Sequence, residues 1–212
     1  MQKLSRKSIA IAIGAMFALI VVLGGMSLAS VPASDDFAPF TMRVTWYTAN
    51  AIVRSSGSVE AGTAVSLLNY ESINTWKTTV LSSSWDPSAV GSTNGVDGRT
   101  HKQFTFVAQA RKFAQRVIPS GESAMIPERW LDPGLINHIE QQGFTRIGNS
   151  RAGTVTFIES SAKSQRNADG TVAMHDGTIA VFDSRSTLPL SVKTYQNGKL
   201  RESRQYEVVS QP

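Results

Sequence analysis

Side chains that could do acid–base or metal chemistry are few and widely separated in this sequence. The three histidines, His101, His138 and His175, show none of the short spacings, such as His-x-x-x-His, that bring two imidazoles to one metal ion. Cysteine is absent, which excludes disulfides, thiolate catalysis and Cys-ligated metals. We therefore expect no metal, no cofactor and no metal-dependent enzyme.

The motifs of hydrolases and nucleotide-binding proteins do not occur in the sequence either. Gly91–Gly95 (GSTNG) lacks the serine of a Gly-x-Ser-x-Gly elbow, although Ser, His and Asp are available and leave a secreted hydrolase as a third alternative. Asn167–Gly177 (NADGTVAMHDG) misses the spacing and the final Glu of a calcium loop, so we interpret it as two tight turns. No Walker or dinucleotide-binding loop is present. We predict that the protein is not an enzyme.

The start of the chain has the pattern of a membrane segment. A basic head with Lys3, Arg6 and Lys7 precedes an almost uncharged run from Ile9 to Ala29, about the ~20 residues that a helix needs to cross the bilayer. This run predicts either a retained anchor or a cleaved signal peptide, because small residues near its end suit signal peptidase. In both cases the remainder lies outside the cytoplasm.

This pattern divides the chain into an export or anchor segment at 1–30, a linker at 31–39, and a single extracytoplasmic domain at 40–212. Without the three basic residues of the head, the remaining 18 of the 21 Lys and Arg nearly balance the 16 Asp and Glu. The domain shows no basic stripe with interleaved aromatic residues, so nucleic acid is not an expected partner.

A period of two in hydrophobicity dominates the chain from Phe40 onward and predicts antiparallel strands. Phe40–Thr48, Gly62–Ser72 and Asn74–Ser83 form a predicted three-stranded meander. Near the C-terminus, Asn197-Gly198 joins two apolar-rich runs as the turn of a β-hairpin spanning Ser186–Val209, which we expect to close the sheet. Further strands are predicted at 152–160 and 177–184, with a loop at 164–170.

The middle of the chain has a less regular pattern. Ser82–Lys102 is rich in Ser, Gly, Pro and Asp and predicts a long mobile loop. Lys102–Ile118 fits both a strand and a helical stripe, and periodicity leaves the two open. Leu131–Phe144 predicts a short amphipathic helix that begins with Asp132 and Pro133 and ends at Gly143. Its buried face would carry Leu135, Ile136 and Ile139.

The segments Ile126–Phe144 and Asp183–Leu200 together resemble the periplasmic lipoprotein carrier (LolA-like) superfamily, which includes lipoprotein and lipid carriers and sigma-factor regulatory proteins. In Asp183–Leu200 (DSRSTLPLSVKTYQNGKL), an Asp-x-x-Ser/Thr-x-Leu-Pro pattern precedes a strand, a turn and a final strand. One departure is that Ser34–Phe40 is too short for the amphipathic helix that usually precedes the first strand. No functional residue of the superfamily matches a position in this chain.

The resemblance implies a mainly β (α+β) domain, a curved antiparallel sheet or open β-barrel with one or two helices on its concave face. It also implies non-catalytic binding or carriage of a lipid, an acylated protein or another apolar ligand at the membrane surface. The alternative is a membrane-tethered protein-interaction or sensor domain, for example of an envelope regulatory system. In the first case Trp46 and Trp76 would be reachable by solvent, and in the second they would be fully packed.

Six residues of the first three strands are the candidate ligand-binding site. We expect them to keep one period-two phase, to converge on one face of the meander and to line a shared apolar cavity. The same alternation also suits a core filled by its own side chains, including the strand aromatics Phe104, Phe106, Phe157 and Phe182. The candidate residues are Met42, Val44, Trp46, Leu67, Trp76 and Val80.

Overall fold

The computed structural model describes residues 37–211, apart from 54–58, 121, 123–125, 127, 133–134, 149–152 and 168–171. The predicted membrane segment 1–30 and most of the linker 31–39 lie outside these residues. Within the described part of the chain, no helix combines the length and the apolar composition needed to cross a membrane.

Twelve strands and three short helical segments make up the described chain. The strands are β1 (Phe40–Val53), β2 (Val59–Ser72), β3 (Thr75–Ser83), β4 (Thr93–Asp97), β5 (Lys102–Val107), β6 (Lys112–Val117), β7 (Phe144–Gly148), β8 (Thr154–Glu159), β9 (Lys163–Arg166), β10 (Val172–Asp183), β11 (Pro189–Gln196) and β12 (Lys199–Ser210). The helical segments are η2 (Pro87–Ala89), η3 (Arg129–Leu131) and α2 (Leu135–His138).

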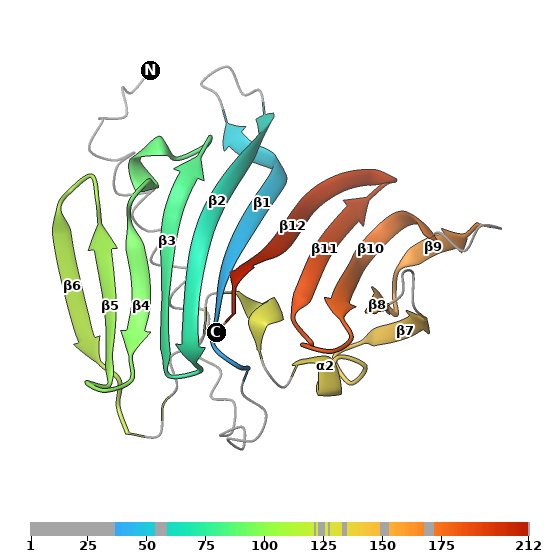
Figure 1. Ribbon diagram of the computed structural model, residues 1–212. Helices are drawn as coiled ribbons and strands as arrows, with labels where there is room; N and C mark the ends of the chain where they lie inside the picture. Colours follow the sequence, from blue (N-terminus) through green and yellow to red (C-terminus); the bar gives the residue numbers. More distant parts are fainter. Residues whose placement is uncertain are drawn as a thin grey trace, which may run out of the picture.

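All twelve strands belong to one antiparallel sheet that curves without closing (Figure 1). The strand order is β6-β5-β4-β3-β2-β1-β12-β11-β10-β8-β7, and β9 pairs with the first half of β10. The predicted fold class and the predicted β1-β2-β3 meander are therefore confirmed.

The C-terminal hairpin forms as predicted, with β11 and β12 joined by Asn197 (φ 52°) and Gly198 (φ 71°). Two consecutive residues in the left-handed region match the twist of the flanking strands, which is why Asn-Gly suits this turn. The hairpin does not close the sheet, however. Because β12 pairs with β1, it lies in the middle and joins the N-terminal strands to the C-terminal ones.

The prediction of a long loop at Ser82–Lys102 is wrong, because this segment contains η2 and the internal strand β4. The physical reason that this segment forms a strand lies at Gly95, in the middle of β4. A Cβ atom there would stand 2.5 Å from the Trp76 carbonyl oxygen and 2.6 Å from the Phe104 ring. Because Gly95 has no side chain, the Phe104 ring can lie over its backbone. Contacts with this ring take the place of those that a larger side chain on β4 would make.

For one further segment the structure selects between the two predicted forms, and for two others it differs from the prediction. Lys102–Ile118 is a β-hairpin, β5 and β6, rather than a helix. Asn167–Gly177 does not form two turns in its described part, since β10 runs from Val172 with a register shift between Met174 and Asp176. The predicted loop at 164–170 includes part of β9.

The predicted helix at Leu131–Phe144 is present but short, since α2 has only four residues. Leu135 and Ile139 are buried as expected, and Gly143 ends the segment with a φ of 85°. The third residue of the predicted buried face, Ile136, has a side chain outside the described ones.

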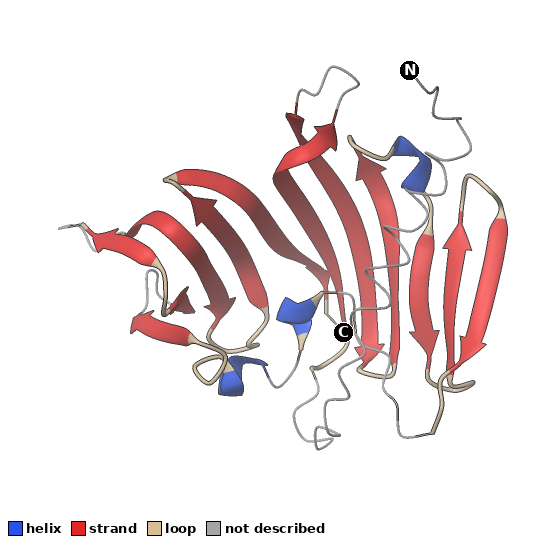
Figure 2. Ribbon diagram, turned by 180° about the vertical axis from the view of Figure 1, so that it is seen from behind, coloured by secondary structure: helices blue, strands red, loops and turns tan. Residues whose placement is uncertain are grey.

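The two faces of the sheet differ in what covers them. We name the face that bears Met42, Leu68 and Trp76 the inner face, and the opposite one, with Arg43 and Lys77, the outer face. η3 and α2 lie against the inner face, where the hydrophobic core sits (Figure 2). Its members come from both halves of the sheet and from the segment between them: Phe40, Met42, Val44, Leu68, Tyr70, Trp76, Val96, Ile126, Trp130, Leu131, Leu135, Ile139, Phe144, Val155, Phe157, Ala180, Phe182, Leu188, Val192 and Tyr206.

Candidate functional site

The strand register brings five of the six candidate residues to the inner face. Met42 pairs with Leu68, and Trp76 pairs with Tyr70 and Val96. Val44, Trp46 and Val80 occupy the same phase of their strands.

Leu67 is the exception, and the prediction that it shares this face is wrong. It pairs with Arg43 on one side and Thr79 on the other, so it lies on the outer face. Two consecutive leucines in β2 fit either phase, and the register turns Leu68, not Leu67, into the core.

The five inner-face candidates differ in how accessible they are. Met42 is 0% exposed, Trp76 2% and Val44 8%, all inside the core. Trp46 and Val80 are only half-buried. The part of the predicted surface open to an incoming molecule is therefore the one with Trp46 and Val80.

Beside Trp46, the inner face carries a charged cluster that the sequence patterns did not indicate. The Arg204 guanidinium on β12 lies 3.3 Å from a Glu128 oxygen and 2.7 Å from a Glu202 oxygen. The side chains of Arg204 and Glu128 are only 23% and 17% exposed. Charges this far removed from water are costly unless they are paired, as these are.

Aromatic rings frame the cluster on two sides. The Arg204 guanidinium lies 5.1 Å from the ring centroid of Trp46, its pairing partner on β1, and the Trp85 ring meets Trp46 edge-on at 5.4 Å. Across the cluster, the Arg129 guanidinium lies 4.6 Å over the ring of the buried Trp130. The buried Nε1 of Trp46 has no hydrogen-bond acceptor among the described residues.

Burial shapes the protonation of the groups around Arg204. Desolvation raises the pKa of Glu128, and the positive charge of Arg204 opposes this shift without cancelling it. Burial also raises the pKa of the neighbouring Tyr206 phenol, and the negative charge of Glu128 adds to the effect. Tyr206 is therefore a neutral phenol in any physiological range.

A cavity of about 250 Å³ opens between η3 and strands β10, β11 and β12. Guanidinium groups, a carboxylate, two hydroxyls and two apolar side chains form its wall. The hydroxyl oxygens of Thr178 and Thr194 are 3.3 Å apart across β10 and β11. The lining residues are Arg129, Trp130, Thr178, Val192, Thr194, Glu202 and Arg204.

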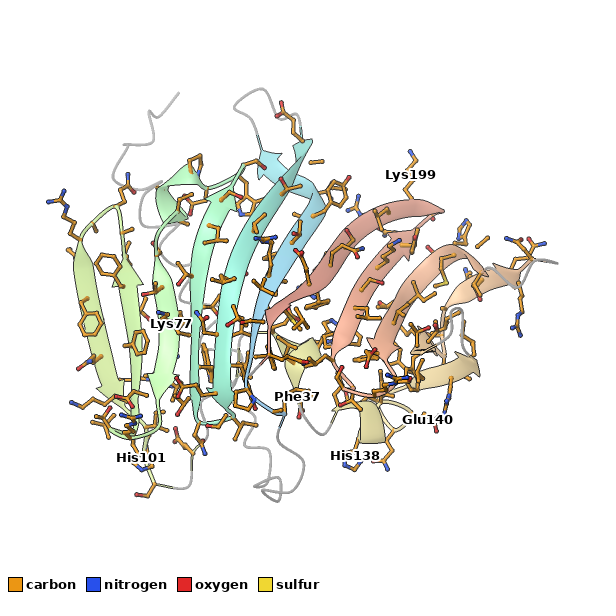
Figure 3. The ribbon with its side chains drawn as sticks, in the orientation of Figure 1. Phe37, Lys77, His101, His138, Glu140 and Lys199 are labelled. Carbon is orange, nitrogen blue, oxygen red and sulfur yellow. The ribbon has the colours of Figure 1, made fainter. Side chains whose placement is uncertain are left out.

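This wall suits binding of a polar or anionic group next to an apolar one. None of the three histidines lines the cavity. His101 is in the turn before β5 and His138 ends α2 (Figure 3). The Nδ1 atom of His175 lies 2.6 Å from an Asp176 carboxylate oxygen. Within the described ranges, no group of three or more His, Cys, Asp or Glu could hold a metal ion.

One pattern in the sequence carries a signal for this site. Glu202, Arg204 and Tyr206 alternate along β12, and Tyr206 faces the core, so two charged residues share a phase with a buried aromatic one. The hairpin register also places Thr194 opposite Glu202. Glu128, by contrast, lies directly before η3 and far from β12 in the sequence, and no local sequence pattern predicted its contact with Arg204.

The motif that carried the family resemblance has a structural role next to the site. The Asp183 Oδ1 atom accepts hydrogen bonds from the backbone N–H groups of Arg185 and Ser186, and these contacts lower the pKa of Asp183. The turn is followed by the buried Leu188 and by the buried Pro189, which is the first residue of β11. The motif thus sets the entry of the strand that carries Thr194.

Comparison with known proteins shows distant similarity of fold. No family model and no curated protein matches the chain. An uncharacterized conserved protein from Thermus thermophilus has 7% identity and a TM-score of 0.43, over 94% of this chain and 90% of that one. A LolA superfamily protein from Nitrosomonas europaea has 8% identity and a TM-score of 0.31 over 90% of both chains.

A putative outer membrane lipoprotein-sorting protein domain from Vibrio parahaemolyticus has 10% identity and a TM-score of 0.31, over 82% of this chain and 84% of that one.

Proposed function

We propose that this chain is a non-catalytic binding protein that takes up an amphipathic ligand, a lipid or an acylated protein, at the outer surface of a membrane. The observation that carries the proposal is the cavity between η3 and β10–β12. There the mostly buried Arg204 separates a polar pocket from the half-buried Trp46 of the apolar inner face.

The cavity chemistry supports a ligand with a polar head. Arg129 and Arg204 offer guanidinium donors to a carboxylate or phosphate, and Thr178 and Thr194 offer hydroxyls. The volume of about 250 Å³ lies just below the ~300–1,000 Å³ of typical ligand pockets, so it suits a head group rather than a whole lipid.

The apolar part of such a ligand would contact Trp46 and Val80, the two predicted site residues of the inner face that are not fully packed. Burial of an acyl chain gains roughly 0.8 kcal/mol per CH₂, which supports binding without further charged contacts. Met42, Val44 and Trp76 would contact the ligand only if η3 and α2, which lie against the inner face, moved. Their role as ligand contacts stays a prediction.

The place of action follows from the N-terminal pattern. A basic head followed by an apolar run would hold the domain in the periplasm or at the outer face of the cell membrane, tethered or released after cleavage. The membrane is then both the neighbour of the domain and the source of its ligand.

One observation favours the second candidate, a tethered protein-interaction or sensor domain. Trp76 is 2% exposed and packs within the core, which is the arrangement expected of a sheet filled by its own side chains. In that case the cavity would have no lipid ligand, and surfaces elsewhere on the domain would contact a partner protein.

A substitution that fills the cavity distinguishes the two candidate functions. The probe is a dansyl-labelled undecanoic acid, whose emission rises in an apolar site, added to the full chain in neutral nanodiscs. We expect Thr194→Phe, which fills the pocket, to weaken binding about tenfold, the effect of losing roughly 1.4 kcal/mol. The matched control is Thr79→Phe, a half-buried threonine on the outer face, which should bind as the original chain does.

Lipid extraction and mass spectrometry of the chain purified from its host form the second measurement. Enrichment of one acylated species that Thr194→Phe abolishes supports the carrier proposal. Equal probe binding by both variants, or no bound lipid and no change in dansyl emission, would replace it with the sensor domain.

A further inference from the structure

The two ends of the sheet are protected to different degrees. At one end β7 has a register shift between Arg146 and Gly148, and its Phe144 is buried. At the other end of the sheet lies β6 (Figure 1), which pairs with β5 without any register shift. All six of its residues are exposed. No other described strand pairs with the free side of β6. Because regular, exposed edges are templates for further pairing, β6 is an available edge in the described part of the chain.

The backbone of β6 has a defined set of groups on this open side. The Ile118 N–H donates to the His101 carbonyl oxygen at 2.8 Å, which makes these two residues a hydrogen-bonded pair. Antiparallel ladders alternate between hydrogen-bonded and non-hydrogen-bonded pairs. The alternation therefore turns the N–H and C=O groups of Phe113, Gln115 and Val117 toward the open edge.

The outer side of this edge is apolar. Phe113 is 59% exposed and Val117 65%, and both share the outer face with the half-buried Phe104 and Phe106. The rings of Phe104 and Phe113 stack with centroids 6.3 Å apart. Exposed aromatic and β-branched side chains on a free edge offer cross-strand contacts to an added strand.

The inner side of the edge is basic. Lys112 and Arg116 occupy the opposite phase of β6, and the Arg116 Nε donates to the Gln103 Oε1 at 2.7 Å. The whole segment 98–121 holds five Lys and Arg and contains no Asp or Glu. A strand that alternates apolar and acidic residues would match both sides of β6.

We propose that β6 is a docking edge for an extended segment of a partner protein, which adds to the sheet as a further strand and alternates apolar with acidic residues. Main-chain hydrogen bonds to Phe113, Gln115 and Val117 supply the affinity of such β-augmentation, and side-chain complementarity supplies its specificity. This surface is separate from the cavity on the inner face, so the inference stands apart from the proposed function.

Two other occupants of the edge fit less well. A second copy of β6 would bring Lys112 and Arg116 against the same basic residues, and facing like charges destabilise a pair of strands. An anionic membrane would match the charge. Inserting the edge into the membrane, however, would bury unpaired backbone N–H and C=O groups in hydrocarbon, which is unfavourable.

Gln115→Pro tests the edge selectively. It removes an N–H that faces outward, not one that pairs with β5, and proline is tolerated at this kind of edge position. The matched control, Gln115→Ala, keeps the N–H. The probe is fluorescein-labelled Val-Glu-Val-Glu-Val-Glu-Val, measured by polarisation with the full chain in neutral phosphatidylcholine nanodiscs. A peptide with Lys in place of Glu is the charge control.

We expect the acidic peptide to bind the original chain and Gln115→Ala alike, and Gln115→Pro about tenfold more weakly, with an unchanged circular dichroism spectrum. Lys112→Glu, which leaves the backbone intact, should weaken the acidic peptide and improve the lysine peptide. Failure of the acidic peptide to bind, or equal binding to Gln115→Pro, overturns the proposal. Displacement of the peptide by phosphatidylglycerol vesicles, or a dimer in sedimentation that Gln115→Pro dissociates, overturns it in favour of a membrane or a second copy.

Discussion

Replacing Arg204 by Met isolates the contribution of the charged cluster on the inner face. Methionine keeps an unbranched side chain of similar length but removes the guanidinium that lies between Glu128 and Glu202 and over Trp46. Glu128 then loses its cation while its side chain stays 17% exposed. The variant therefore leaves a mostly buried carboxylate without a counter-charge, although the Trp130 backbone N–H still donates to it.

The structure sets the size of the expected effect. Removing one partner of a fully buried ion pair costs about 3–5 kcal/mol. Because Arg204 is 23% exposed, water screens part of this cost, and we expect the free energy of unfolding to fall by about 2–3 kcal/mol. For a domain of this size, each kcal/mol shifts the melting temperature by about 2–4 °C, so Arg204→Met should melt about 4–12 °C lower.

A double-mutant cycle checks this reasoning by thermal unfolding, followed by circular dichroism at neutral pH. Glu128→Gln removes the charge that Arg204→Met leaves unpaired, so the double variant should be more stable than the two single losses predict. We expect a coupling of about 1 kcal/mol or more between the two positions. A melting temperature unchanged in Arg204→Met, or strictly additive single effects, would refute the ion pair as a stabilising contact.

Two further predictions concern the same cluster and the C-terminal turn. Burial raises the pKa of Glu128 in the folded chain above its ordinary value of 4.5, so its ionisation opposes folding. As the pH rises from about 4.5 through the folded pKa, the original chain should lose stability relative to Glu128→Gln, and a relative gain in melting temperature would contradict burial as the dominant cause. Gly198→Val introduces no contact, since nothing lies within 4 Å of a Cβ atom added there, but its φ of 71° strains a β-branched residue. It should lower stability by about 1–2 kcal/mol, and an unchanged melting temperature would count against this turn.

The parts of the fold that local chemistry determines were predictable from the sequence. Phe40–Thr48 alternates strictly, and Asn197-Gly198 takes the positive φ values that the turn needs, so β1 and the final hairpin followed from neighbouring residues alone. The face of β2 did not follow in the same way. Leu67 and Leu68 are adjacent and equally apolar, and only pairing with β1 decides that Leu68 is buried.

Features that depend on distant residues were not predictable from local patterns. β4 contains glycine and polar residues typical of a loop, and it becomes a strand because Phe104 covers Gly95 and Trp76 lies on the neighbouring strand. The charged cluster has the same origin. Glu128 lies in the segment between the two halves of the sheet, and no spacing rule relates it to Arg204 on β12.

The position of Arg204 relates the cluster to the proposed function. An ion pair that served stability alone could be replaced by apolar side chains of similar size with little loss and often with a gain. Arg204 instead lines a cavity and pairs with Glu202, whose side chain is 34% exposed. On the proposed function, the head group of the ligand would compete with Glu202 for the guanidinium, while Glu128 would continue to hold Arg204 from the side of η3. The cluster would then pass from one paired state to another as the ligand enters, and the buried arginine would never lack a counter-charge.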